Sequence, residues 1–277
     1  MFGIDIIVHK VRPEKGITYF SLCREIGIPL ISKSVARSVR RVRRYLQQAG
    51  LQYSDIEPYL SPTKDNVEKL LEMGLNKTSV IILLGYNFKD GCFGSMSKLS
   101  DKWRPLIYAP FEVSEMCCDE LKKKPAKRIS KIVGKFVPMT GEKAIDSMQR
   151  KLAYVKTGCN AIDTKSMSGV SKPLGSMTEQ GLLHNAKRLQ IPMADIYGDI
   201  IQIDNNYCFS GAQRTGCDCC GFGITHEPDR FVKLYERNPA KVREAFKPVD
   251  QGGLGYKEAI EYLNKYCKCK IEIPQIE

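Results

Sequence analysis

Apolar residues spaced three and four positions apart recur along this chain and predict amphipathic helices. In the clearest case, Val35, Val39, Val42 and Leu46 fall at helical spacing among polar and basic residues. Further helices are predicted at residues 16–26, 62–74, 178–189, 238–246 and 256–266. Ser61 is the expected N-cap of the helix at 62–74, because Pro62 and Asp65 suit a first turn.

Short apolar runs between these helices predict buried strands. Residues 5–8 and 135–139 are candidates, and residues 28–31 fit a turn or a strand. Residues 80–84 fit either a strand or the middle of a helix. Strands that alternate with helices indicate an α/β fold with a mostly parallel sheet.

A chain of 277 residues is long enough for one large domain or two small ones. We expect an α/β domain at residues 1–205, with a cysteine turn and helices at residues 206–277 packed on it. No run of about 18 apolar residues predicts a membrane span. The N-terminus lacks the layout of a signal peptide, so we expect a cytoplasmic protein.

The net charge of +12 implies an anionic partner or a basic surface. Residues 33–44 carry six Lys and Arg side chains on the polar side of a predicted helix, the arginine helix. The simplest interpretation is a solvated basic face. The alternative is contact with an acidic ligand such as a nucleotide or a nucleic acid.

Eleven cysteines in a chain expected in a reducing compartment favour metal ligation or redox chemistry over disulfides. Two groups stand out, the adjacent residues Cys117 and Cys118, and Cys217 with Cys220. Cys217 and Cys220 are three residues apart, which lets both sulfurs face one metal site. Flanking glycines allow a tight turn whose amides can donate hydrogen bonds to sulfur.

The adjacent cysteines limit the kind of metal site. Successive helical side chains diverge by about 100°, so Cys117 and Cys118 share no helix face, but at a helix end both can reach a wide centre. This favours a [4Fe–4S] cluster over zinc, the alternative cofactor. Lys122, Lys123 and Lys124 would offset the charge of four thiolates. The competing interpretation is that these cysteines are buried apolar side chains.

The cysteine groups also carry a family resemblance. Cys117-Cys118-x-x-Leu-Lys-x-x-Pro125, followed by Cys217-x-x-Cys220, resembles the signature of adenylyl sulfate reductases, which bind a [4Fe–4S] cluster. The surrounding sequence is similar to the wider phosphoadenylyl sulfate (PAPS) reductase-like family. Supporting stretches lie at residues 141–150, 157–163, 172–174, 178–180, 191–192, 196–198 and 214–217.

The resemblance implies a fold of the adenine-nucleotide α-hydrolase type and an oxidoreductase of sulfur metabolism. In such reductases a thiol attacks the sulfur of an adenylylated sulfate, which the cluster and nearby cations hold. A thioredoxin-like protein is the implied reductant. By position, Lys143, Ser147 and Arg150 would bind the anionic substrate, since sulfate needs fixed cationic donors. The alternative is that Lys143 and Arg150 are exposed helix cations.

Two features of the family have no match in this sequence. The glycine-rich phosphate loop is missing, because the chain begins with what resembles the family's third strand. We expect the first strand–helix units to lie in a longer chain or a partner chain. The family's late catalytic cysteine is also unmatched. Cys267 and Cys269 are the remaining candidates, and neighbouring lysines could lower their pKa.

Three functions fit these observations. The leading one is thiol-dependent reduction or transfer of sulfur from an adenylylated sulfate. The first alternative is a sulfur transferase that acts on nucleic acid and contacts it through the arginine helix. The second is a non-catalytic metal-binding fragment that needs a partner chain to complete its nucleotide site.

Overall fold

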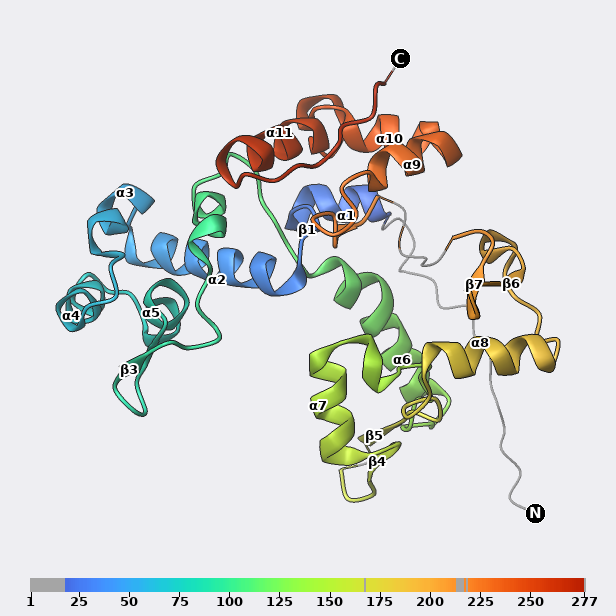
Figure 1. The fold of residues 1–277 in the computed structure, drawn as a ribbon. Coiled ribbons are helices and arrows are strands. Elements are labelled where there is room, and N and C mark those ends of the chain that lie inside the picture. Colours follow the sequence, from blue (N-terminus) through green and yellow to red (C-terminus); the bar gives the residue numbers. More distant parts are fainter. Residues whose placement is uncertain (1–17, 167, 213–216, 218, 277) are drawn as a thin grey trace. The chain divides into compact units, whose positions relative to one another are not determined.

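A computed structural model describes residues 18–166, 168–212, 217 and 219–276 (Figure 1). The chain forms two compact units. Unit 1 comprises Met1–Lys124 and Asp218–Glu277, and unit 2 comprises Pro125–Cys217. This division differs from the expected boundary after residue 205, because side chains of residues 219–271 share one core with those of residues 22–117.

Unit 1 is mainly helical. Its helices begin where the sequence supplies a capping side chain: Thr18 accepts a hydrogen bond from Ser21 N, and Ser32 accepts one from Val35 N. The helices are α1 (Tyr19–Ile26), α2 (Lys33–Ala49), α3 (Tyr53–Ile56), α4 (Lys64–Glu72), α5 (Lys77–Leu84), α9 (Arg230–Arg237), α10 (Pro239–Phe246) and α11 (Tyr256–Tyr266).

Two of these helices correct or complete the sequence prediction. α4 begins later than expected, because Thr63 instead of Ser61 caps it. Residues 80–84 lie in α5, where Asn76 caps the N-terminus and Gly85 ends the helix at φ +75°. Local capping therefore decides the strand-or-helix ambiguity in favour of a helix.

The core of unit 1 combines an aliphatic stripe with an aromatic cluster. The predicted stripe of α2 faces inward, with buried side chains at Val39, Val42 and Leu46. Helices α9, α10 and α11 bring three rings together, with centroids 5.2, 5.3 and 6.0 Å apart, from Phe231, Phe246 and Tyr256.

The described strands are short and form only two-stranded sheets. β1 (Leu30–Ile31) pairs in parallel with β8 (Gly221–Phe222), and a parallel bridge joins Ile28 to Val113. The other described sheets are antiparallel hairpins: β2 (Tyr86–Asn87) with β3 (Cys92–Phe93), β4 (Asn160–Asp163) with β5 (Ser168–Ser171), and β6 (Ile200–Ile203) with β7 (Asn206–Phe209).

The mixed α/β class is therefore confirmed, but the described residues form no mostly parallel sheet. β1 stops after two residues because Ser32 caps α2 directly behind it. Residues 135–139 contribute a single bridge, from Met139 to Ser171, in place of the expected strand. The expected strand at residues 5–8 lies outside the described residues.

Unit 2 has a much smaller core. Its helices are α6 (Lys124–Ile132), which starts at the boundary, α7 (Met148–Thr157) and α8 (Glu179–Arg188). Among its described residues, the buried apolar side chains are Leu183 and Ala186 of α8. In the part of the chain that the structure describes, no helix has the length and hydrophobicity that a membrane crossing requires.

Candidate metal centre

The structure relates three of the four predicted cysteine ligands. Cys117 and Cys118, here called the first pair, lie at the start of a helical segment that continues through a π-helical turn. Cys219 and Cys220, the cysteine turn, directly precede β8. Both groups belong to unit 1. Cys217 belongs to unit 2, and its neighbours on either side lie outside the described residues.

The strand before α2 brings the first pair and the cysteine turn together. On one edge, Ile28 N donates to Glu112 O (2.9 Å) and Ser114 N donates to Ile28 O (3.0 Å). In β1, Leu30 pairs with Gly221 of β8. The first pair follows residues 112–114, which bond to Ile28. The cysteine turn precedes β8, which pairs with β1. Backbone pairing therefore joins two sequence-distant thiol groups.

Three side chains from three helices fix the cysteine turn. Cys219 O accepts hydrogen bonds from Tyr256 OH (2.6 Å) and Tyr19 OH (2.9 Å), and Cys220 O accepts one from Arg230 Nε (2.9 Å). Burial raises the pKa of both phenols, so they stay protonated and donate. Cys219 lies in the left-handed region at φ +58°, which these contacts hold in place.

The two thiols of the turn have different environments. The Cys219 side chain is 1% exposed and its Sγ donates to Lys241 O at 3.6 Å. Cys220 is partly exposed and close enough to Cys117 to affect its pKa. At Gly221 a Cβ atom would lie 2.4 Å from Leu30 Cδ2, so the close approach of the turn to β1 requires glycine.

The first pair has an asymmetric charge environment. Cys117 donates a hydrogen bond to Cys118, which raises the pKa of Cys117, and burial and the nearby thiols of Cys23 and Cys220 add to this. The same hydrogen bond lowers the pKa of Cys118, and Lys33 and Lys122 act in the same direction against burial. The pKa of Cys118 is therefore the lower of the two.

The lysines around this site differ from the expected set. Lys122 lies near Cys118, but Lys123 and Lys124 each form an ion pair with a carboxylate one turn earlier, at 2.6 Å. Lys33, the first residue of α2, also faces Cys118 and lies 5.9 Å from the ring centroid of Phe222. Sequence reasoning missed Lys33, because its place in the arginine helix gave no sign of a thiol neighbour.

The donor set suits a cluster chemically. Thiolates are the ligands of iron–sulfur clusters, and backbone or lysine donors near sulfur compensate their charge. Among the described residues, no three His, Cys, Asp or Glu side chains are arranged around one ion. A cluster has a different requirement, since each cysteine binds a different iron and the sulfurs lie farther apart than around one ion.

The arginine helix is only in part the solvated basic face that we expected, because Arg41 and Arg44 are exposed whereas Arg40 and Arg43 bind partners inside unit 1. Arg40 Nη2 pairs with Glu115 Oε1 at 2.7 Å, and Arg37 Nε lies 3.4 Å from the same oxygen. Glu115 is 5% exposed, and burial, the largest single influence, opposes its ionisation. The hydrogen bond from Arg40, a backbone hydrogen bond, the charge of Arg40 and the hydrogen bond from Arg37 together outweigh burial, so the pKa of Glu115 is lowered. Arg43 donates to four backbone carbonyls, at Leu106, Ile107, Ala109 and Phe111.

The predicted substrate residues come together in unit 2 around one carboxylate. Asp146 lies 3.5 Å from Lys143 Nζ and 2.9 Å from Arg150 Nη1. Ser147 caps α7 by accepting from Arg150 N at 3.3 Å. These groups already have partners within unit 2, so an anion bound here would compete with Asp146.

The two late cysteines do not have the lowered pKa that their flanking lysines predicted. Cys267 and Cys269 are buried in unit 1. Burial raises the pKa of Cys267 to about 12 and also raises the pKa of Cys269, while Lys102 acts weakly in the opposite direction. The flanking lysines of the sequence do not lower either pKa. In this conformation neither thiol is suited to nucleophilic attack.

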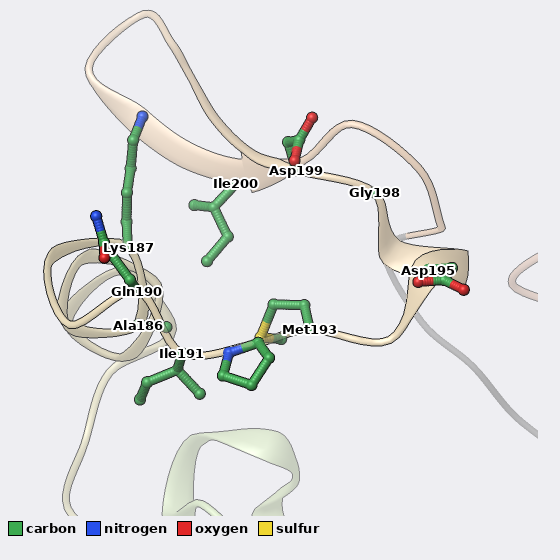
Figure 2. Close-up of a pocket in the computed structure, with 10 residues that line it drawn as sticks. Ala186, Lys187, Gln190, Ile191, Met193, Asp195, Gly198, Asp199 and Ile200 are labelled. Atoms are coloured by element: carbon green, nitrogen blue, oxygen red, sulfur yellow. The ribbon is translucent and has the colours of Figure 1, made fainter.

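A separate cavity of about 600 Å³ lies in unit 2 between the end of α8 and the start of β6 (Figure 2). Its lining includes Lys187, Met193, Asp199 and Ile200, and none of the predicted site residues. Figure 2 shows Ile200 directed toward the end of α8. The predicted chemistry therefore lies elsewhere.

Comparison with known proteins adds no assignment. No protein-family model, curated protein or solved structure matches this chain.

Proposed function

We propose that this protein holds a [4Fe–4S] cluster on Cys117, Cys118 and Cys220, with Cys217 as the fourth ligand. One observation carries the proposal: the segments next to the first pair and the cysteine turn both pair with the backbone of residues 28–31, and Cys220 lies close enough to Cys117 to affect its pKa, although about a hundred residues separate them in sequence. Buried cysteines without a ligand would not need this convergence. They would also not need a turn held by three side-chain donors.

The surroundings of the three thiols support this proposal. A cluster with four thiolates carries negative charge, and Lys33 and Lys122 face Cys118. When bound, the cluster would help to hold an anionic substrate beside the thiols. The chain's own residues fix the ligand geometry: Tyr19 and Tyr256 orient the cysteine turn.

By resemblance, we extend the proposal to thiol-dependent reduction or transfer of sulfur from an adenylylated sulfate. The proposed fold is then of the adenine-nucleotide α-hydrolase type. The parallel pairing of β1 with β8 and the bridge from Ile28 to Val113 are compatible with part of such a sheet. The nucleotide-binding half of the site would be supplied by a partner chain or by residues other than those that the structure describes.

The nucleic-acid alternative loses two of the six cations of its expected contact surface. Arg40 and Arg43 are engaged with a buried carboxylate and with backbone carbonyls in unit 1. An arginine that neutralises a phosphate must be free to leave such partners. We therefore rank sulfur chemistry on a small anionic nucleotide above chemistry on nucleic acid.

The test is anaerobic purification of the full chain, followed by measurement of iron, acid-labile sulfide and visible absorbance. We expect about four iron atoms per chain and a broad visible shoulder. Cys220→Ser should lose most of the iron. Cys219→Ser is the matched control, because this neighbouring thiol binds Lys241 O and serine can make the same hydrogen bond.

Two results would contradict the proposal. A colourless protein that retains zinc would replace the cluster by a zinc site. Equal loss of iron in the Cys219 and Cys220 variants would show that the turn matters only as a structural element. Release of sulfite from adenylyl sulfate with dithiothreitol as reductant then tests the reaction separately.

A further inference from the structure

Helix α7 of unit 2 is attached to the rest of its unit along one side only. The Tyr154 ring packs against Gly175, where a Cβ atom would lie 2.6 Å from Tyr154 Cε2, and Tyr154 OH lies 3.5 Å from Cys159 Sγ. Arg150, near the same side, pairs with Asp146. These contacts fix the helix, and no described residue of unit 2 covers the opposite side.

That opposite side is an apolar stripe. Met148, Leu152 and Val155 are 68%, 63% and 76% exposed. Their spacing of four and three residues places them within a sector of about 60° on the helix surface. Ile145, in the turn before the helix, is 56% exposed. Neighbouring exposed apolar side chains of this kind mark an interaction surface more often than isolated ones.

Two lysines border the stripe. At about 100° per residue, Lys151 lies on one side of the stripe and Lys156 on the other. Both are exposed, and among the described residues neither has an ion pair. The resulting pattern, a narrow apolar seam with a charge on each side, is the pattern of positions a and d flanked by e and g in a coiled coil.

We propose that this face of α7 is a docking surface for an acidic amphipathic helix of a partner protein. The seam would receive apolar side chains of the partner helix, and carboxylates beside its own seam would pair with Lys151 and Lys156. The proposal does not depend on the cluster, because every residue it uses lies in α7 or the preceding turn.

Two other occupants fit the pattern less well. A second copy of this chain would place lysine against lysine in either helix orientation, which disfavours self-association. A lipid surface favours a wider apolar face, at least about 100°, than the narrow seam of α7. Charge and width therefore both favour an acidic helix.

The test uses the full chain and two synthetic helical peptides of about 21 residues with leucine at positions a and d. One peptide carries glutamate at e and g and the other carries lysine. We expect anisotropy titrations to show binding of the glutamate peptide, weakened by salt, and weak or no binding of the lysine peptide. Leu152→Gln should lower the affinity for the glutamate peptide by roughly tenfold.

The decisive variant is the double charge reversal Lys151→Glu with Lys156→Glu, which should reverse the preference between the two peptides. Ala153→Glu, at an exposed position about 130° around the helix from the centre of the seam, serves as a matched charge control with a smaller effect. Circular dichroism checks that each variant keeps its helix content.

Three outcomes would overturn the proposal. Equal binding of both peptides, or of neither, would remove the charge-complementary seam. Concentration-dependent dimerisation that Leu152→Gln abolishes would identify a second copy as the occupant. Binding to phosphatidylserine vesicles that outcompetes the glutamate peptide would identify a lipid surface.

Discussion

Unit 1 and unit 2 differ in how their side chains are held, and the candidate chemistry divides in the same way. Unit 1 surrounds its thiols with a continuous apolar core and with donors from three helices. Unit 2 buries Leu183 and Ala186 and relies on ion pairs such as Lys172 with Glu142 at 3.3 Å. The comparison teaches that residue type alone does not make a site, because a ligand also needs a fixed position.

The predicted ligands illustrate this difference. Cys220 is carried by a turn whose backbone oxygens are hydrogen-bonded by buried or half-buried side chains. Lys143 and Arg150 instead share the carboxylate of Asp146, and each has one longer contact of 4.0 Å, with Glu179 and Glu142 respectively. Exposed ion pairs contribute little to stability and rearrange easily. Unit 1 therefore offers a preorganised centre, while the anion-binding residues of unit 2 would have to exchange partners.

The largest expected effect breaks the core of unit 1. Phe231 is fully buried beside Phe246 and Tyr256. Phe231→Ala should lower the free energy of unfolding by about 3–5 kcal/mol, because it removes apolar contacts and leaves a cavity. Urea titration followed by fluorescence of Trp103, the single tryptophan and a member of unit 1, measures this.

Leu183→Ala in unit 2 is the matched truncation. It should leave the Trp103 transition nearly unchanged, because the core of unit 1 contains no side chain from this part of the chain among the described residues. An equal shift of the transition in both variants would show that the two units unfold as one.

An intermediate effect concerns the buried carboxylate of unit 1. Glu115→Gln keeps the shape of the side chain but removes the charge that Arg40 binds at 2.7 Å. We expect a loss of about 1–3 kcal/mol, with the half-exposed Arg37 contributing little. The same urea titration measures this loss at neutral pH.

The pH dependence gives a second readout. The pKa of Glu115 is lowered in the folded state, so its contribution is present above the unfolded value of about 4.3 and is lost as pH falls through the folded pKa. Wild-type protein should therefore lose this stability in acid, and Glu115→Gln should flatten the pH profile. Parallel profiles for the two proteins would contradict the assigned role.

Each helix that the local patterns predicted is present, because helix formation depends on neighbours along the chain, but α3, α6, α7 and α9 were not predicted. The stripe of α2 and the bounds of α11 follow from periodicity, and the error at α4 is a choice between two capping residues, Ser61 and Thr63. The sheet was mispredicted because strand pairing is non-local. Nothing near residues 135–139 shows that this run meets Ser171 at a single bridge.

The candidate site was predictable to a similar degree. Cysteine spacing indicated two thiol groups and selected Cys220 as a ligand, but it did not show that backbone pairing at Ile28 and Leu30 brings the two groups close together. Tyr19 and Tyr256 resemble ordinary core aromatics in the sequence, and their hydroxyls meet Cys219 O only through tertiary packing. The arginine helix was predicted, but the partners of its side chains were not. Arg43 donates to backbone carbonyls, which no sequence pattern marks.

The smallest expected effect sharpens the account of the cysteine turn. Tyr256→Phe removes the shorter of the two hydroxyl hydrogen bonds to Cys219 O, at 2.6 Å, and leaves the buried ring in place. We expect a loss of about 1 kcal/mol in urea titration, because Tyr19 still satisfies the carbonyl. Tyr19→Phe should cost no more, since Tyr256 remains.

The double variant, Tyr19→Phe with Tyr256→Phe, tests whether the two hydrogen bonds to Cys219 O contribute cooperatively or independently. With both hydroxyls removed, Cys219 O is left without these donors, and the cost should exceed the sum of the single losses. Tyr262→Phe is the control, because its hydroxyl donates to Pro105 O at 2.8 Å and not to the cysteine turn. Additive losses would indicate that the two tyrosines do not hold the turn together.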